Sequence, residues 1–228
     1  MIALVFVLGL VGSAVAGSPE LKANGAVMLD GRHTPVYWDD GDTFKVVETG
    51  QSARLEGFNA LESYGPVHRF GAGPTELAAI AQQSTEHAKG SVWNCQVQPG
   101  SGGYGRIRVA CLDLAKSLIE RGLAHAFSMD GPAAAPLLSA QRAAIESRVG
   151  MWQQGAPQAI VTSVHSLDER PNQAETYNRV VDTRSGESTK VVHDHTIAAC
   201  RWVCHQGSCL LYVPFSQRYA SQAAWCLR

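Results

Sequence analysis

The sequence lacks a strong net charge, a membrane-length apolar run and any internal repeat. Its 228 residues carry a formal net charge of −1, which argues against a strongly basic protein that coats nucleic acid. The apolar run at residues 2–11 is too short to cross a bilayer as a helix. The hydrophobic share of 45% is ordinary for a globular protein, so a sizeable core is expected.

The N-terminal residues 1–16 have the pattern of a secretory signal. Their apolar run is followed by Ala14-Val15-Ala16, a small-x-small cleavage site. No Lys or Arg precedes the run, and a buried strand or helix is the alternative. No cysteine follows the run directly, which argues against a lipid anchor. Export to the periplasm or the medium would place the six cysteines in an oxidising compartment, where disulfides are expected.

Strand-like and helix-like runs alternate between residues 20 and 156. The expected strands cover residues 35–38, 43–47, 53–58, 91–98 and 106–112, and the expected helices cover 74–89, 114–122 and 135–149. This order predicts an α+β domain with a five-stranded, OB-type Greek-key barrel and about three helices at one side. Trp38 and Trp93 are expected in its core.

Two of the cysteines flank a glycine-rich turn. Cys95 and Cys111 are placed symmetrically about the centre of the segment PGSGGYG. In an antiparallel hairpin these two residues could face each other across the strands. We therefore predict a Cys95–Cys111 disulfide.

Residues 158–228 differ in character and are expected to form a separate cysteine-rich module with a β-hairpin at 177–182 and 189–195. Disulfides would help so small a unit to fold. Sequence cannot choose among the three possible pairings of its four cysteines. Zinc is the alternative, although the paired C-x-x-C spacing is absent. The cysteines are Cys200, Cys204, Cys209 and Cys226, and the nearby histidines are His193, His195 and His205. Substrate capture, envelope attachment and structural capping are all open as roles.

Charged and polar side chains are concentrated at residues 36–62, around the expected turns. Carboxylates can hold a divalent cation, an arginine can hold a phosphate, and a free glutamate can accept a proton from water. The pattern therefore indicates metal-assisted chemistry on a phosphate ester, and a solvated acidic turn is the alternative. The side chains concerned are Asp39, Asp40, Asp42, Arg54, Glu56, Asn59 and Glu62.

Five motifs occur in one order along residues 34–153. They are Asp40-Gly41-Asp42-Thr43, then Arg54-Leu55 with Gly57-Phe58-Asn59-Ala60 and Glu62, then Tyr104-Gly105-Arg106, Gly122-Leu123-Ala124, and a helix ending in Gly-Met-Trp. In this order and spacing the segment resembles the staphylococcal nuclease (thermonuclease) family.

The resemblance implies a calcium site. The residue matching Asp42 binds the ion directly, and the one matching Asp40 supports the site. Further ligands are the side chain matching Asn59 and the backbone carbonyl matching Ala60. Hard oxygen ligands suit calcium, which would neutralise the phosphate under attack.

The resemblance also implies three catalytic residues and one substrate-binding residue. The glutamate matching Glu62 activates the attacking water, and the arginines matching Arg54 and Arg106 hold the phosphate. Tyr104 matches a residue that lines the nucleotide pocket. His33, His68, His87 and His125 match no ligand spacing and are expected to be surface or hydrogen-bonded residues.

Three positions depart from the family pattern. Asn59 stands where an aspartate is usual, which removes one negative charge and predicts weak calcium binding, at about 10⁻⁴–10⁻³ M. Ala60-Leu61 replaces a pair that ends in proline, and Gly103 replaces a lysine that contacts phosphate.

The expected function is that of an exported, calcium-dependent endonuclease. Its substrate would be single-stranded or denatured DNA and RNA, with no stable nucleic-acid partner and no membrane span, and the protein is expected to be a monomer. The alternative is a non-catalytic OB-fold module that binds nucleic acid or an envelope ligand and has a degenerate metal site at Asn59. A third possibility makes the C-terminal module the functional part.

Overall fold

A closed barrel of six strands forms the first part of the chain. In the computed structural model, residues 21–219 and 223–227 are described, and the predicted signal at 1–16 lies outside them. Neighbouring strands pair antiparallel, except that β1 pairs with β7 and β4 with β8 in parallel. Around the barrel the strands are β1 (Gly25–Leu29), β2 (Arg32–Asp40), β3 (Thr43–Val46), β4 (Ser52–Leu55), β8 (Ile107–Ala110) and β7 (Trp93–Ser101).

The barrel therefore has one strand more than the five expected from the sequence. The additional strand is β1, a short apolar run that turns into β2 through Asp30 and Gly31, both at positive φ (49° and 80°). Its parallel pairing places Val27 opposite Trp93, far along the chain. A contact between such distant residues has no local sequence signal, which is why the run was not expected to be a barrel strand.

Three α-helices pack on the barrel: α1 (Pro74–Lys89), α2 (Leu112–Glu120) and α3 (Ala135–Glu146). Proline at the start of α1 suits the first helical turn, where its missing N–H is not needed. Trp38 is buried in the core between barrel and helices, whereas Trp93 is half-buried and its indole N–H donates to the carbonyl of Ala88 (2.8 Å). Two short strands, β5 (Phe58–Ala60) and β9 (Ala124–Ala126), pair antiparallel beside this core.

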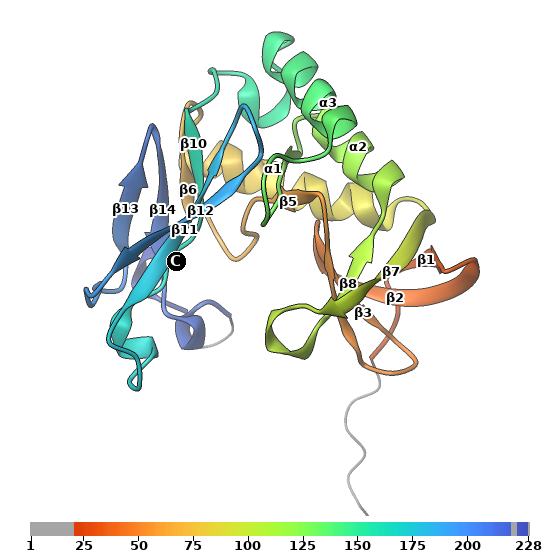
Figure 1. Ribbon diagram of the computed structural model, residues 1–228, viewed down its shortest axis with the longest axis horizontal. Coiled ribbons are helices and arrows are strands. Elements are labelled where there is room, and N and C mark those ends of the chain that lie inside the picture. The colour runs from red at the N-terminus through yellow and green to blue at the C-terminus, as the bar shows by residue number, and fades with distance from the viewer. Residues whose placement is uncertain (1–20, 220–222, 228) are drawn as a thin grey trace, which may run out of the picture.

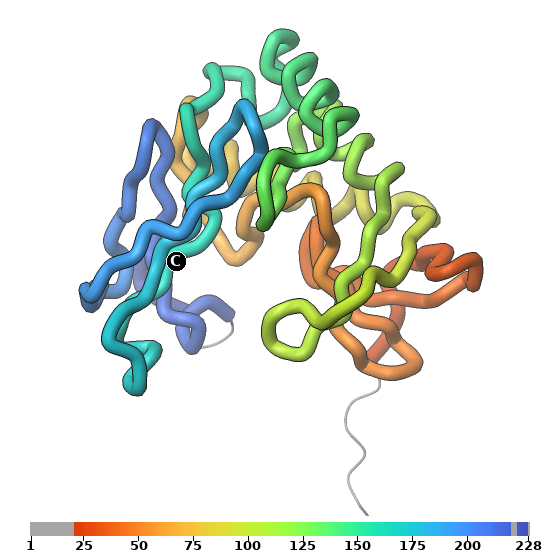
Figure 2. The backbone as a smooth tube through the Cα atoms, in the orientation of Figure 1, coloured from red at the N-terminus to blue at the C-terminus, as the bar shows by residue number. Residues whose placement is uncertain are grey.

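The C-terminal part contains two three-stranded sheets. One has β11 (Thr176–Asp182) between β10 (Ala159–Ser163) and β12 (Ser188–His193). The other has β14 (Ser208–Tyr212) between β13 (Arg201–His205) and β6 (His68–Arg69). Because β6 lies in the loop after β5, the C-terminal residues complete a sheet with the N-terminal part. The barrel and the C-terminal sheets form the two sides of an arch, with the helices across its top (Figure 1, Figure 2).

All six cysteines are paired, as Cys95–Cys111, Cys200–Cys226 and Cys204–Cys209. The first is the pairing expected from the glycine-rich turn, and the other two resolve the pairing that the sequence left open. No thiolate of the C-terminal module is left to bind zinc. Three disulfides indicate an extracytoplasmic protein. Within the described residues, no helix is long and apolar enough to cross a membrane.

Candidate active site

Asp42 is the buried centre of the candidate site. It lies in the tight turn between β2 and β3, and its side chain is 3% exposed. Gly41 is required there because a Cβ at this position would lie 2.1 Å from Oγ of Ser84 on α1. One oxygen of Asp42 accepts a hydrogen bond from Oγ1 of Thr43 (3.1 Å), and the other accepts from the backbone N–H of Ala60 (2.7 Å). The turn therefore fixes a carboxylate that cannot easily move.

Arg54 reaches Asp42 from the neighbouring strand. In the β3–β4 pairing Arg54 lies opposite Thr43, the residue that follows Asp42. Its guanidinium donates one hydrogen bond to Oδ1 of Asp42 and another to Oδ1 of Asn59. The oxygens of these two side chains thus converge on one positive charge.

Asn59 and Ala60 complete this group of oxygens. Asn59 lies on β5, opposite His125 of β9, and is 9% exposed. Its Nδ2 donates to the carbonyl oxygen of Ala60 (2.7 Å), so the amide bridges its own neighbour and Arg54. Carboxylate, amide and carbonyl oxygens are the ligand types that suit a hard divalent cation, and the guanidinium of Arg54 bonds two of these three oxygens. In the described part of the chain, no cluster of three His, Cys, Asp or Glu side chains could hold a metal.

Asp40 supports the turn from the end of β2. Its Oδ1 accepts the backbone N–H of Asp42 (3.0 Å). Burial raises the pKa of Asp40 well above its usual value, and the negative charge of Asp42 raises it further. Two carboxylates held so close disfavour the ionised pair and would favour a bound cation.

Glu62 lies in the loop after β5 and is half-buried. Burial raises its pKa, and the positive charge of Arg218 opposes that shift more strongly than the charge of Arg54 does. A carboxylate with a raised pKa is a better proton acceptor than an ordinary one. The backbone N–H of Glu62 donates to Nε2 of His68 (3.0 Å), and this hydrogen bond ties the loop to β6.

His68 and His125 are buried rather than at the surface, at 3% and 1% exposure. Nε2 of His68 accepts a hydrogen bond, so the ring is neutral with its proton on Nδ1. Nδ1 of His125 lies 3.0 Å from the carbonyl oxygen of Ala126. Burial lowers the pKa of His68 to about 3 and that of His125 to about 4.

Arg106 and Tyr104 lie on the rim, in the turn between β7 and β8. Nε of Arg106 donates to the carbonyl of Gly103 (3.0 Å), and its guanidinium lies 5.9 Å from the ring centroid of Tyr104. Tyr104 is 90% exposed, at a positive φ of 62°. Partial burial and the nearby Arg54 lower the pKa of Arg106, while Asp42 and Asp40 raise it. The expected phosphate-binding arginine thus lies within the electrostatic range of the buried carboxylates.

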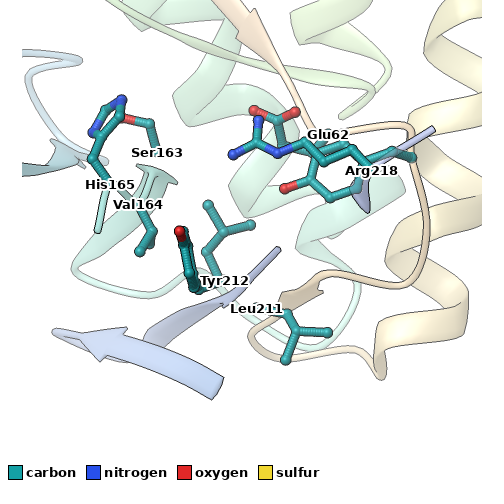
Figure 3. Close-up of a pocket in the computed structure, with 9 residues that line it drawn as sticks. Glu62, Ser163, Val164, His165, Leu211, Tyr212 and Arg218 are labelled. Carbon is teal, nitrogen blue, oxygen red and sulfur yellow. The ribbon is translucent and has the colours of Figure 1, made fainter. Parts of the chain in front are cut away.

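The C-terminal part contributes side chains to a pocket beside Glu62, which the sequence did not predict. A pocket of about 40 Å³ is lined by Glu62 and Tyr64 from the loop after β5, and by Ser163 and Arg218 from the C-terminal sheets and their final loop. Figure 3 shows the carboxylate of Glu62 and the guanidinium of Arg218 at the same end of this pocket. No motif marks Arg218, so only the fold could reveal it.

No family model and no curated protein matches the chain.

Proposed function

We propose that the protein is an extracytoplasmic, divalent-cation-dependent phosphodiester hydrolase with an OB-type barrel, exported to the periplasm or the medium. The observation that supports this most is the gathering of Asp42, Arg54, Asn59 and Glu62 from separate strands and loops, with Arg106 on the rim. These are the residue types and the order in which the sequence resembles staphylococcal nuclease. DNA and RNA in single-stranded or denatured form are the proposed substrates.

Glu62 acts as the general base in this proposal. Its raised pKa suits it to take a proton from the attacking water, and its protonation at low pH would stop the reaction. Arg106 donates hydrogen bonds to the phosphate oxygens and stabilises the developing negative charge, and Arg54 joins it when its guanidinium leaves Asp42 and Asn59. A calcium ion bound by Asp42, Asn59 and the Ala60 carbonyl would neutralise the phosphate. Following the resemblance, cleavage leaves a 3′-phosphate.

The test is hydrolysis of heat-denatured DNA with calcium and with a chelator. Glu62→Gln should lower the rate by about 10²–10⁴-fold and Arg106→Ala by about 10²–10³-fold. Glu48→Gln and Arg142→Ala are matched controls, because Glu48 pairs with Arg32 at the surface and Arg142 is an exposed residue of α3 that donates to Ser139. No calcium-dependent loss of substrate, or full activity in Glu62→Gln, would refute the proposal.

A second candidate function is binding without turnover. It is favoured by the guanidinium of Arg54, which bonds Asp42 and Asn59, and by the amide of Asn59, which donates to the carbonyl of Ala60. A module of this kind would bind oligonucleotides or an envelope ligand and leave them intact. Its signature is saturable binding of denatured DNA with no product at any calcium concentration.

A further inference from the structure

We propose that the C-terminal module forms the second half of the substrate site. Arg218 binds a phosphate of a single-stranded nucleic acid beside Glu62, and Tyr219 stacks on one of its unpaired bases. This inference rests on the proposed function, because it takes Glu62 as the reacting end of the site.

Arg218 is held in place by its surroundings and keeps its charge available. Its Nε donates to the carbonyl of Val213 (2.9 Å), and its guanidinium carbon lies 5.0 Å from the ring centroid of Tyr64 and 5.9 Å from that of Phe215. Across the described chain, no carboxylate oxygen lies within 4.0 Å of this guanidinium. An arginine oriented in this way beside a hydrolytic glutamate is suited to bind an anionic oxygen of the substrate.

Tyr219, the next residue after Arg218, provides an exposed ring beside Tyr64. It is 57% exposed, and its ring centroid lies 6.0 Å from that of Tyr64 and 6.4 Å from that of Phe215, both in edge-to-face geometry. Burial and the charges of Glu62 and Asp40 raise the pKa of Tyr219, so its hydroxyl lies within electrostatic range of both carboxylates. Phe215 is itself 70% exposed. Exposed aromatic rings of this kind are suited to stack on unpaired bases.

The barrel presents a similar pair on its own rim. The guanidinium carbon of Arg106 lies 5.9 Å from the ring centroid of Tyr104, and Arg106 lies within electrostatic range of Asp40 and Asp42. One arginine–tyrosine pair from the barrel and one from the C-terminal module therefore flank the carboxylates. Alternating cations and rings match the alternating phosphates and bases of a single strand. In a duplex the base faces are stacked on each other and cannot reach Tyr219, so we assign a single strand.

Binding can be measured separately from turnover in the Glu62→Gln background with calcium present. A fluorescently labelled oligothymidylate is titrated by anisotropy at several salt concentrations. Arg218→Gln should weaken binding and make the slope of log K against log salt shallower by about 0.7, whereas Arg218→Lys should keep the slope. Tyr219→Ala should weaken binding about 5- to 100-fold without changing the slope, and Tyr219→Phe should restore it.

Two exposed positions outside the site serve as controls. Arg142→Gln removes a positive charge from α3, and Leu112→Ala removes an apolar side chain that is 64% exposed. Both should bind the oligonucleotide like the Glu62→Gln parent. A closed DNA duplex is titrated in parallel, and the effect of Tyr219→Ala should be absent there. An equal loss on duplex and single strand would overturn the single-strand assignment.

The outcomes separate this inference from the proposed function. If the native chain hydrolyses denatured DNA but Arg218→Gln and Tyr219→Ala bind as tightly as the parent, the inference is wrong and the hydrolase stands. If both variants lose affinity but the native chain hydrolyses nothing, the binding surface stands and the hydrolase fails. Retention of binding by Tyr219→Phe shows that the oligonucleotide needs the ring of Tyr219 and not its hydroxyl, and duplex binding by Tyr219→Ala equal to that of the parent shows that this variant is folded.

Discussion

Replacing Asn59 by aspartate would test the candidate cation site at the position where it departs from a two-carboxylate arrangement. In the native chain Nδ2 of Asn59 donates to the carbonyl oxygen of Ala60 (2.7 Å). Asn59→Asp replaces this donor by a carboxylate oxygen, which faces the carbonyl with no proton between them. Without metal the lost hydrogen bond should cost about 1–3 kcal/mol of folding free energy, the usual penalty for an unsatisfied buried polar group, and the attraction of the new carboxylate to Arg54 opposes this cost.

With calcium, the new carboxylate should strengthen binding of the ion. A unit charge 4 Å from another contributes about 4 kcal/mol at an effective dielectric constant of 20. A divalent cation would therefore gain about 8 kcal/mol from the new carboxylate, while the competing guanidinium of Arg54 gains about 4 kcal/mol. The difference of about 4 kcal/mol is an upper limit, because desolvating the carboxylate opposes it. We expect a Kd for calcium that is about 10- to 100-fold lower, equal to about 1.4–2.7 kcal/mol.

Calorimetric titration of chelator-treated protein measures this Kd, and thermal unfolding with and without calcium measures both effects together. The variant should show a larger upward shift of Tm with calcium than the native chain does. Asn172→Asp, at an exposed position, adds the same charge as a control. An unchanged Kd in Asn59→Asp would refute the assignment of Asp42, Asn59 and Ala60 as the cation site.

The same variant separates the two candidate functions. If the native chain is an active hydrolase, Asn59→Asp should raise calcium affinity with a modest gain in turnover. If it is a binding module with a degenerate site, turnover should rise steeply from a baseline near zero. Hydrolysis of denatured DNA at saturating calcium distinguishes these results.

Three further predictions concern stability. Burial keeps His68 neutral, with its pKa lowered to about 3. The unfolded chain therefore binds more protons than the folded chain below pH 6.5, and the free energy of unfolding falls as the pH falls. The raised pKa values of Glu62 and Asp40 have the opposite effect on stability. His68→Gln should therefore reduce the loss of unfolding free energy between pH 7 and pH 5 by about 2 kcal/mol, as measured by urea unfolding. An unchanged loss of unfolding free energy would contradict this. Removing Cys95–Cys111 with two alanines should cost about 3 kcal/mol for a loop of this length, and equal midpoints under non-reducing conditions would contradict it. Gly41→Ala should lower the Tm strongly, because its Cβ would lie 2.1 Å from Oγ of Ser84. Ser84→Gly should partly restore it, and a neutral Gly41→Ala would refute the steric argument.

The local parts of the fold could be predicted from the sequence. Helix α1 covers residues 74–89 as expected, because its proline start, helix-forming residues and glycine end are all adjacent in the chain. The sequence did not predict β1 as a barrel strand, because only its pairing with β2 is local, and the pairing that closes the barrel is with the distant β7. The sequence left open whether His125 is a surface or a hydrogen-bonded residue, because its buried, hydrogen-bonded place depends on the pairing of β9 with β5.

The candidate site shows the same division. The motif order predicted that Asp42, Arg54 and Asn59 belong together, and the structure brings them into direct contact. The motif order could not predict that Arg54 donates to Oδ1 of Asp42 and to Oδ1 of Asn59, because these hydrogen bonds depend on side-chain geometry. Arg218 carries no sequence signal, since its place beside Glu62 depends on two sheets that join residues far apart. The roles of these residues in catalysis remain predictions.

The pairing of β6 with β14 means that the sheet beside the Glu62 loop cannot form until residues near the C-terminus are present. β6 follows Glu62 by only a few residues, and its sheet partner begins at Ser208. The turn between Cys204 and Cys209, closed by their disulfide, holds that partner in place. Under the proposed export, the loop that carries Glu62 would gain its support from β14 only after residues 208–212 have followed the rest of the chain across the membrane. The proposed hydrolytic site would thus mature only after the C-terminal residues reach the oxidising side, away from the nucleic acids of the cell that makes it.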